Sequence, residues 1–219
     1  MSSTLQYEFG SDAYLTQALT HRSASSTNNE RLEFLGDAVL DTVISEIVYR
    51  DQPEAAEGEL SRLRSSLVKD ASLAELAAEL GLGEHLILGP GEKKAGGHRR
   101  GSILADALEA IFGAVYLDAG YEAAARVICT AYGERLQNLP DAADLRDPKT
   151  RLQEYLQAKK LGLPTYEITD TSGKAHKQFF TVACVVAKLN MRSVGVGSSR
   201  RDAEQQAADR MLGDLENLD

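Results

Sequence analysis

The spacing of apolar residues predicts that the N-terminal part of the chain is helical. Apolar side chains recur every three or four residues in successive segments, and Ser, Thr, Asn, Gly and Pro separate these segments. Asn28 or Asn29 can cap the second predicted helix, and Ser102 can cap the fifth. The expected helices span residues 5–20, 30–49, 60–68, 71–80, 102–118 and 121–136. This pattern is typical of an all-α domain.

The pattern changes in the last third of the chain. Residues 137–147 contain Pro140 and several small or acidic residues, a composition typical of linkers. We place the linker at 141–147, between a first domain at 1–140 and a second at 148–219. The second domain is expected to contain helices over 149–160 and 202–218 and strands over 166–169, 178–189 and 192–196. The fold class is therefore multidomain, an all-α domain followed by an α+β domain of order α-β-β-β-α.

Two of the predicted helices carry carboxylates that have no helical cationic partner. Glu30, Glu33 and Asp37 line one face of the second helix, and Glu33 and Asp37 repel each other at i, i+4. Asp106 and Glu109 are the only acids of the apolar fifth helix before its end. Carboxylates on apolar helices that pack together would repel each other and lose hydration unless a hard divalent cation lay between them. Because Mg²⁺ favours carboxylate oxygens and water, the pattern predicts a magnesium site.

Ordinary solvated helix faces are the alternative interpretation of these acids. The missing cationic partners and the apolar flanks count against it, and so does Gly36. A glycine inside a helix costs about 1 kcal/mol relative to alanine, which is usually tolerated only where another group must approach the backbone closely. We therefore expect a close contact at Gly36.

The charge distribution separates the two predicted domains. The net charge of the chain is −9, whereas a protein that simply coats phosphate would be basic. Residues 1–146 hold 13 Lys and Arg against 23 Asp and Glu, a net of −10, and residues 147–219 hold 11 against 10, a net of +1. An acidic domain that recruits metal, joined to a domain that grips an anionic substrate, would show this asymmetry, as would many unrelated proteins.

The remaining composition predicts a cytoplasmic protein with no membrane partner. Cys129 and Cys184 lie far apart without metal-binding spacing, and we interpret them as buried apolar residues in a reducing compartment. The N-terminus lacks the basic-then-apolar pattern of a signal peptide, and no apolar run approaches the ~20 residues that a membrane helix needs.

Residues 88–101 form a glycine-rich segment with five basic side chains. No Gly-Lys-Ser/Thr pattern follows its glycines, which argues against a nucleotide-binding loop. The segment either contacts substrate phosphates or is simply solvated, and the sequence leaves both interpretations open.

The segment Asn29-Glu30-Arg31-Leu32-Glu33-Phe34-Leu35-Gly36-Asp37 resembles the signature motif of ribonuclease III, the family of double-stranded-RNA endonucleases. The resemblance extends through residues 18–23, 57–61, 102–118 and the C-terminal segment, and covers nearly the whole chain. It implies that the catalytic, metal-binding acids are Glu30, Asp37, Asp106 and Glu109, with Glu33 and Glu57 as accessory acids. The implied cofactor is Mg²⁺, for which Mn²⁺ is expected to substitute.

The resemblance also implies a mechanism and an assembly. Two metal ions about 3.5–4 Å apart would activate water and stabilise the leaving 3′ oxygen, giving products with 5′-phosphate and 3′-hydroxyl ends. The family acts as a homodimer in which each subunit cuts one strand, leaving short 3′ overhangs, and it processes rRNA precursors and other structured transcripts. Phe34 matches a residue that inserts into the partner subunit, although a Phe on an apolar helix is usually ordinary core.

The C-terminal domain resembles a double-stranded-RNA-binding domain in its α-β-β-β-α order and in two segments, Gly173 to His176 and Gly195 to Glu204. One face of its first helix offers hydrogen-bonding groups suited to 2′-hydroxyls, and the start of its last helix offers arginines and backbone N–H groups that favour phosphate. The candidate RNA-binding residues are Thr150, Gln153, Gln157, His176, Ser199, Arg200 and Arg201.

Two rival functions remain open at this point. A double-stranded-RNA-binding regulator that does not cleave predicts the loss of at least one metal-binding acid, whereas this sequence keeps all four. An all-α, carboxylate-rich nucleotide pyrophosphohydrolase would leave the C-terminal domain unexplained. Metal-dependent cleavage of double-stranded RNA accounts for both domains.

Overall fold

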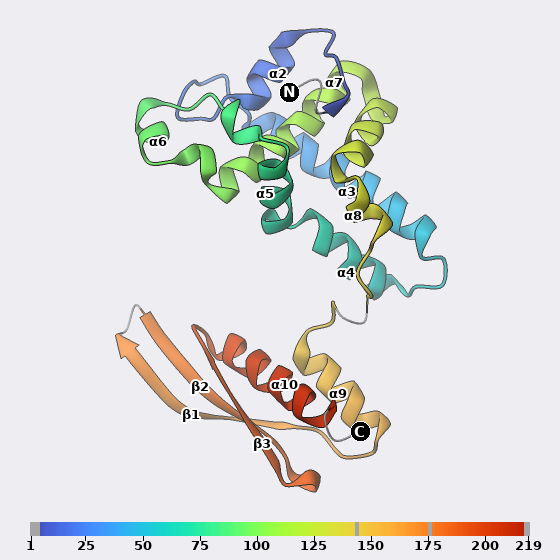
Figure 1. The fold of residues 1–219 in the computed structure, drawn as a ribbon, viewed down its shortest axis with the longest axis vertical. Helices are drawn as coiled ribbons and strands as arrows, with labels where there is room; N and C mark the ends of the chain where they lie inside the picture. The colour runs from blue at the N-terminus through green and yellow to red at the C-terminus, as the bar shows by residue number, and fades with distance from the viewer. Residues whose placement is uncertain (1–4, 143–144, 175–176, 217–219) are drawn as a thin grey trace. The chain divides into compact units, whose positions relative to one another are not determined.

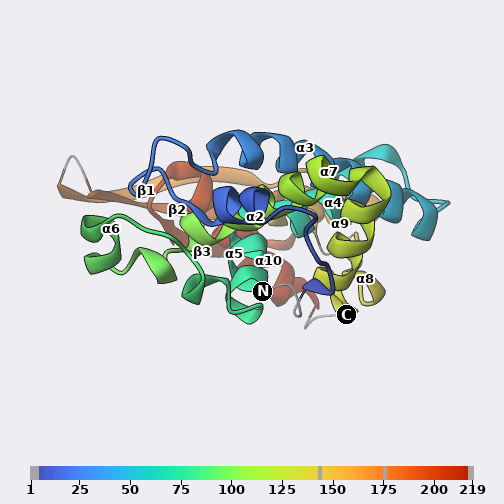
Figure 2. The ribbon, with the colours of Figure 1, turned by 90° about the horizontal axis from the view of Figure 1, so that it is seen from above.

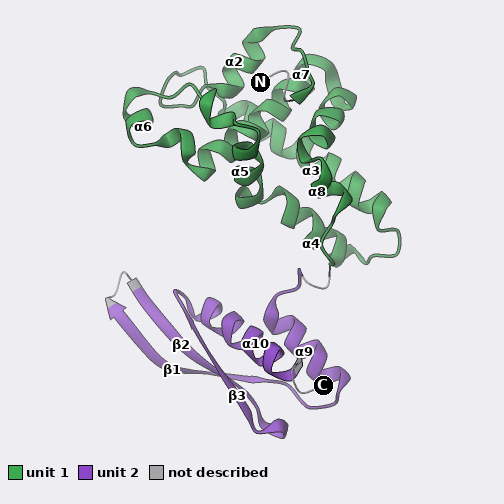
Figure 3. Cartoon of the chain, in the orientation of Figure 1, with its two compact units in different colours: residues 1–142 green, residues 143–219 purple. Residues whose placement is uncertain are grey.

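The computed structural model describes residues 5–142, 145–174 and 177–216. The chain divides into two compact units, residues 1–142 and residues 143–219 (Figure 3). The first unit is built from helices, and the second contains a three-stranded antiparallel sheet with two helices. The predicted fold class is therefore confirmed.

The first unit contains a succession of helices that differ greatly in length (Figure 1). They are α2 (Asp12–Leu19), α3 (Glu30–Asp51), α4 (Glu57–Val68), α5 (Asp70–Glu79), α6 (Pro90–Lys94), α7 (Gly101–Tyr132) and α8 (Glu134–Gln137). Two short 3₁₀ turns lie between them, Leu82–Glu84 and Gly97–Arg99. The segment 88–101 is thus partly helical rather than a continuous loop.

The first predicted helix is shorter than the sequence pattern indicates. α2 begins at Asp12 because the side chain of Ser11 caps it, accepting a hydrogen bond from the backbone N–H of Ala13 at 3.3 Å. Just before this cap, the backbone N–H of Gly10 donates to Oδ2 of Asp118 at 2.8 Å. These contacts hold the preceding residues outside the helix, so the prediction of a helix over 5–20 is wrong at its start.

The predicted helix 102–118 and most of the predicted helix 121–136 are joined in α7, which ends at Tyr132, and the last predicted residues belong to α8. The helix runs through Gly120, whose φ of 78° and ψ of −175° interrupt the helical backbone. Glycine adopts a positive φ readily because it has no Cβ, so the apolar run continues on both sides of the break. The predicted cap is wrong, because Arg100 occupies the N-cap position and Ser102 is already inside the helix.

α3 and α7 lie side by side (Figure 2) and pack against each other more extensively than any other pair of described helices. Their backbones touch at two glycines. A Cβ built on Gly36 would lie 1.8 Å from the backbone oxygen of Glu109, and one built on Gly113 would lie 2.3 Å from that of Leu32. The close approach expected at Gly36 is therefore present. Apolar side chains of both helices are buried around it, including Leu32, Val39, Leu40, Val43, Leu108, Ile111, Phe112 and Val115.

Gly36→Ala is expected to destabilise the protein by about 2 kcal/mol. Overpacking typically costs about 1–3 kcal/mol, and a Cβ that meets a backbone oxygen places this site at about 3 kcal/mol, of which the better helix propensity of alanine returns about 1 kcal/mol. Urea unfolding of the full chain measures the free energy. Gly91→Ala in α6 is the matched control, because a Cβ there meets no atom within 4 Å. Equal stability of the two variants would show that the helices can separate without cost.

The second unit packs two helices on one face of its sheet (Figure 1). Its elements are α9 (Pro148–Ala158), β1 (Thr165–Lys174), β2 (Lys177–Val186), a 3₁₀ turn at Ala187–Leu189, β3 (Met191–Gly197) and α10 (Arg200–Glu216). The strands are antiparallel in the order β1-β2-β3. The second strand is shorter than predicted because its last predicted residues form the turn, and α10 begins two residues earlier than predicted.

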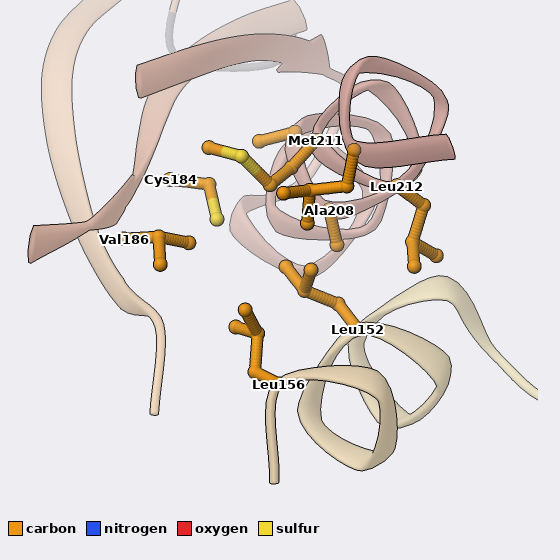
Figure 4. Packing of buried hydrophobic residues seen from close by; sticks show 9 residues of the cluster. Leu152, Leu156, Cys184, Val186, Ala208, Met211 and Leu212 are labelled. Atoms are coloured by element: carbon orange, nitrogen blue, oxygen red, sulfur yellow. The ribbon is translucent and has the colours of Figure 1, made fainter. Parts of the chain in front are cut away.

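The core of the second unit lies between α9, α10 and β2. Figure 4 shows Leu152 and Leu156 of α9 pointing toward Ala208, Met211 and Leu212 of α10, with Cys184 and Val186 of β2 beside them. This cluster fixes the two helices against each other. It leaves their polar faces available for other contacts.

The two cysteines have different surroundings. Cys184 is buried in this core as predicted, whereas Cys129 is exposed on α7, and both are free thiols. The prediction that Cys129 is buried is wrong because its side chain lies outside the apolar stripe of the helix. Within the described part of the chain, no helix is both long enough and apolar enough to cross a membrane.

Candidate active site

Three carboxylates meet where α3 crosses α7. One oxygen each from Glu33, Asp106 and Glu109 lies within 4.8 Å of the others. Glu33 lies one turn before Gly36 on α3, and Glu109 lies one turn before Gly113 on α7. The glycine contact therefore brings these acids together between two helices whose facing sides are otherwise apolar.

Burial and mutual repulsion both disfavour the charged forms of these acids. Burial raises the pKa of Glu109 to about 8, and the charges of Asp37, Glu33 and Asp106 add to this effect. The pKa of Glu33 is also raised, first by burial and then by Asp106 and Glu30. Burial raises the pKa values of Asp106 and Asp37 as well. A bound divalent cation would offset both the cost of burying these charges and their mutual repulsion, so the donor set fits a hard metal ion.

The structure places the two outer acids of α3 differently. Asp37 is not one of the three clustered carboxylates, yet its charge is the strongest of those that raise the pKa of Glu109. Glu30 is exposed, and its Oε1 lies 3.4 Å from Nη1 of Arg22. Glu33, expected to be accessory, thus takes the clustered position expected of Glu30. A sequence signal for this was present, because Glu33 is the acid one turn from the glycine.

A cavity of about 530 Å³ opens beside the carboxylates. Glu33 and Asp106 form part of its wall, together with Arg22, Arg100 and Ser102. Arg100 comes from the basic segment 88–101, and its Nη1 lies 2.9 Å from Oε1 of Glu92. Of the two interpretations of that segment, contact with substrate phosphates is favoured at Arg100, because this side chain lies in the wall that also carries the acids.

Glu57 lies apart from the carboxylate cluster. It is the first residue of α4 and is exposed. It lines a smaller cavity of about 210 Å³ with Tyr49 and Arg64. Within the described residues of this single chain, it is not part of the three-carboxylate group.

Phe34 projects from the helix that carries Glu33. Its side chain is 82% exposed, so it is not core of this subunit. It lines a cavity of about 610 Å³ whose wall is apolar at Tyr14, Leu35 and Leu117 and charged at Glu30 and Arg31. An exposed aromatic residue in an apolar patch is typical of a surface that contacts another molecule.

The candidate RNA-binding residues of α9 share an exposed face. Thr150, Gln153 and Gln157 are all exposed. The hydroxyl of Thr150 donates to Oδ2 of Asp147 at 2.7 Å, so its oxygen remains available only as an acceptor. The two glutamines keep both donor and acceptor groups for a ligand.

Three of the remaining candidates, Ser199, Arg200 and Arg201, lie at the start of α10. Ser199 caps this helix, because its Oγ accepts a hydrogen bond from the backbone N–H of Asp202 at 3.1 Å. Arg200 and Arg201 are exposed in the first turn. Arg200 donates through Nε to Glu204 at 2.8 Å, a contact that the i, i+4 spacing indicates and that our sequence analysis missed. His176 lies outside the described residues.

The raised pKa of Glu109 predicts how stability depends on pH. An ordinary glutamate titrates near 4.3, so the folded state binds this proton more tightly than the unfolded state does. Without divalent cations, the free energy of unfolding should therefore fall as the pH rises from about 5 through 8. Chemical unfolding in EDTA over this range measures the slope, and Glu109→Gln should flatten it. An unchanged slope in the variant would place the titration elsewhere.

Comparison with known proteins gives a consistent result for both units. The sequence model described as Ribonuclease-III-like matches residues 11–136, and the double-stranded RNA binding motif matches residues 148–215. Ribonuclease 3 of Nitrosococcus oceani is 55% identical over 210 residues, covering 95% of this chain and 90% of that protein. Ribonuclease 3 of Aliivibrio fischeri is 51% identical over 222 residues, covering 98% of this chain and 100% of that protein.

A solved structure resembles the first unit. The nuclease domain of ribonuclease III from Campylobacter jejuni is 44% identical, with a TM-score of 0.61, over 63% of this chain and 96% of that one. That structure is described in terms of flexibility in a region involved in dimer formation.

Proposed function

The chain belongs to the ribonuclease III family, and we propose that it hydrolyses double-stranded RNA in a Mg²⁺-dependent reaction that leaves 5′-phosphate and 3′-hydroxyl ends with short 3′ overhangs. The observation that carries this proposal is the carboxylate cluster of Glu33, Asp106 and Glu109 between the otherwise apolar facing sides of α3 and α7. The family is metal-dependent, and this cluster is the site at which the chain would hold the ion.

The donor set favours magnesium. Its ligands are carboxylate oxygens, which hard cations prefer, and no His or Cys joins the group among the described residues. Mn²⁺ accepts the same ligands and is expected to substitute. When bound, the metal would activate a water molecule and stabilise the charge that develops on the leaving oxygen. The charge of Asp37 raises the pKa of Glu109, and Asp37 would be the fourth acid at the site beside the three clustered carboxylates.

The residues around the cluster would orient the RNA. Arg22 and Arg100 lie in the wall of the adjacent cavity, where they can offset the charge of substrate phosphates. The acidic first unit alone would bind RNA poorly, so affinity is expected to come mainly from the second unit. Its exposed polar residues on α9 and arginines on α10 suit recognition of an A-form duplex by shape.

The proposal includes a homodimer that acts in the cytoplasm. One active site cuts one strand, so two subunits are needed to cut both. The apolar patch around Phe34 supports such an interface, because an 82% exposed Phe is stabilised by burial against a second copy. The expected cellular substrates are rRNA precursors and other structured transcripts, and a reducing compartment suits the two free thiols.

The test is a cleavage assay on end-labelled, perfectly paired RNA of several helical turns, with and without Mg²⁺. We expect metal-dependent cutting to short duplexes with 3′ overhangs, and retention of binding in EDTA. Binding without cutting under any divalent ion would favour the alternative function, a double-stranded-RNA-binding regulator.

A further inference from the structure

A buried carboxylate joins the first turns of α9 and α10. Glu204 of α10 is only 9% exposed. Its Oε2 lies 2.6 Å from Nζ of Lys149 on α9, and its Oε1 accepts the hydrogen bond from Nε of Arg200 at 2.8 Å. One carboxylate therefore holds two cations from helices that are distant in sequence. The apolar packing of these helices in Figure 4 supports the same junction.

The neighbouring Gln205 completes the junction. Its Oε1 accepts the backbone N–H of Lys149 at 3.1 Å, and its Nε2 donates to Oδ1 of Asp147 at 2.9 Å. Asp147 in turn caps α9 by accepting the backbone N–H of Thr150 at 3.1 Å. Pro148 has no N–H to donate, so the donors at the start of α9 are already used. This helix start is therefore a structural joint, and phosphate contacts in this region fall to side chains.

Arg200 is the side chain that the joint leaves oriented for phosphate. Its bond to Glu204 uses Nε, which fixes the plane of the guanidinium, and its side chain is 63% exposed. The terminal nitrogens form the planar fork that binds phosphate oxygens in pairs. An orientation that is fixed before binding loses less conformational entropy when RNA binds. Lys149, by contrast, is held inward, 4.6 Å from the centre of the Tyr166 ring.

We propose that Glu204 is a positioning residue for double-stranded RNA, because it holds Arg200 in its phosphate-binding orientation where α9 and α10 meet. This inference rests on the proposed function, in which Arg200 contacts the RNA. The proposed role differs from what charge alone predicts, because a carboxylate near phosphates should repel them and weaken binding. If only charge mattered, neutralising Glu204 would strengthen RNA binding, whereas loss of the positioning contact would weaken it.

The experiment measures the dissociation constant of the full chain for a perfectly paired RNA longer than the ~16 bp that such a domain spans. EDTA in the buffer prevents cleavage. Glu204→Gln is expected to weaken binding about tenfold, the loss of one charge-assisted contact, although it makes the chain less acidic. Asp209→Asn is the matched control, because it removes the same charge from an exposed position of α10 and should leave binding equal or slightly tighter.

A double-mutant cycle separates positioning from general damage to the fold. Arg200→Ala should weaken binding, and adding Glu204→Gln should weaken it little further, because Glu204 acts through Arg200. Arg200→Lys keeps the charge but cannot give one N–H to Glu204 and present a planar fork to phosphate, so it should bind nearly as weakly as Arg200→Ala.

The outcomes separate this inference from the function on which it rests. A wild-type chain that does not bind the duplex would contradict the proposed function. Wild-type binding that Glu204→Gln leaves unchanged or tightens, or independent effects in the cycle, would overturn the positioning role alone. Thermal unfolding checks that each variant folds. If Glu204→Gln does not fold, Glu204→Asp decides, because it keeps the charge but shortens the side chain by one carbon, so full affinity would overturn the role and weakened affinity would support it.

Discussion

Glu109→Gln should lower the rate of RNA cleavage at least about a thousandfold while leaving RNA binding intact. The change removes one of the three clustered carboxylates and keeps the size of the side chain. A metal ion contributes several kcal/mol to the stabilisation of a transition state, and about 4 kcal/mol corresponds to a thousandfold in rate. Binding should persist because the candidate RNA contacts lie mainly in the second unit.

The measurement is a single-turnover cleavage rate with saturating enzyme, together with the dissociation constant in EDTA. Glu122→Gln is the matched control, since it makes the same change at an exposed position of the same helix, and should cleave normally. Glu109→Gln should fold normally, because the neutral amide replaces a carboxylate whose charged form is disfavoured by burial. Cleavage at the wild-type rate would remove Glu109 from the site.

Most of the architecture could be predicted from local patterns. Helical spacing located the segments that became α3, α4 and α5, and alternation with β-branched residues located the strands of the second unit. Gly36 was informative because its cost in a helix required a compensating contact, which the structure provides at Glu109. These features could be predicted because they depend on residues that are close in sequence, or on the cost of a glycine inside a helix.

The boundaries of several elements depended on contacts that local patterns do not contain. α2 starts at Asp12 partly because the distant Asp118 holds Gly10. α7 passes through Gly120, where sequence reasoning placed an end, because glycine tolerates the break and the apolar stripe resumes beyond it. In the second unit, the link from Glu204 to Lys149 joins two helices, and only the Arg200 half of it has a sequence spacing that could have been recognised.

The choice among the candidate metal-binding acids also depends on contacts between residues that are distant in sequence. Helical spacing puts Glu30, Glu33 and Asp37 on one face, and Gly36 indicates where along that face another helix crosses, but neither pattern says which acid of that face meets the acids of the other helix. The crossing is set by the contact of Gly36 with Glu109, and it favours Glu33, which is one turn away, over Glu30, which is two turns from the crossing. Glu30 lies beside Arg22 in the wall of the same cavity, outside the three-carboxylate group.

Glu33→Gln is therefore expected to be far more damaging than Glu30→Gln. Loss of a clustered carboxylate should reduce the cleavage rate at least about a hundredfold, and part of this loss should be recovered at high Mg²⁺ because the weakened site can be refilled by mass action. Glu30→Gln removes an exposed partner of Arg22 and should reduce the rate less than about tenfold, consistent with the small contribution of exposed ion pairs.

Cleavage rates measured over a series of Mg²⁺ concentrations distinguish the two assignments. If Glu33 binds the metal in the position that the cluster indicates, its variant alone needs much more Mg²⁺ to reach half of its maximal rate. A variant of Glu30 with the greater Mg²⁺ requirement and the greater loss of rate would show that the metal draws Glu30 away from Arg22 on binding. In that case the resemblance-based choice of Glu30 would be the better guide to the occupied site, and Glu33 would be accessory.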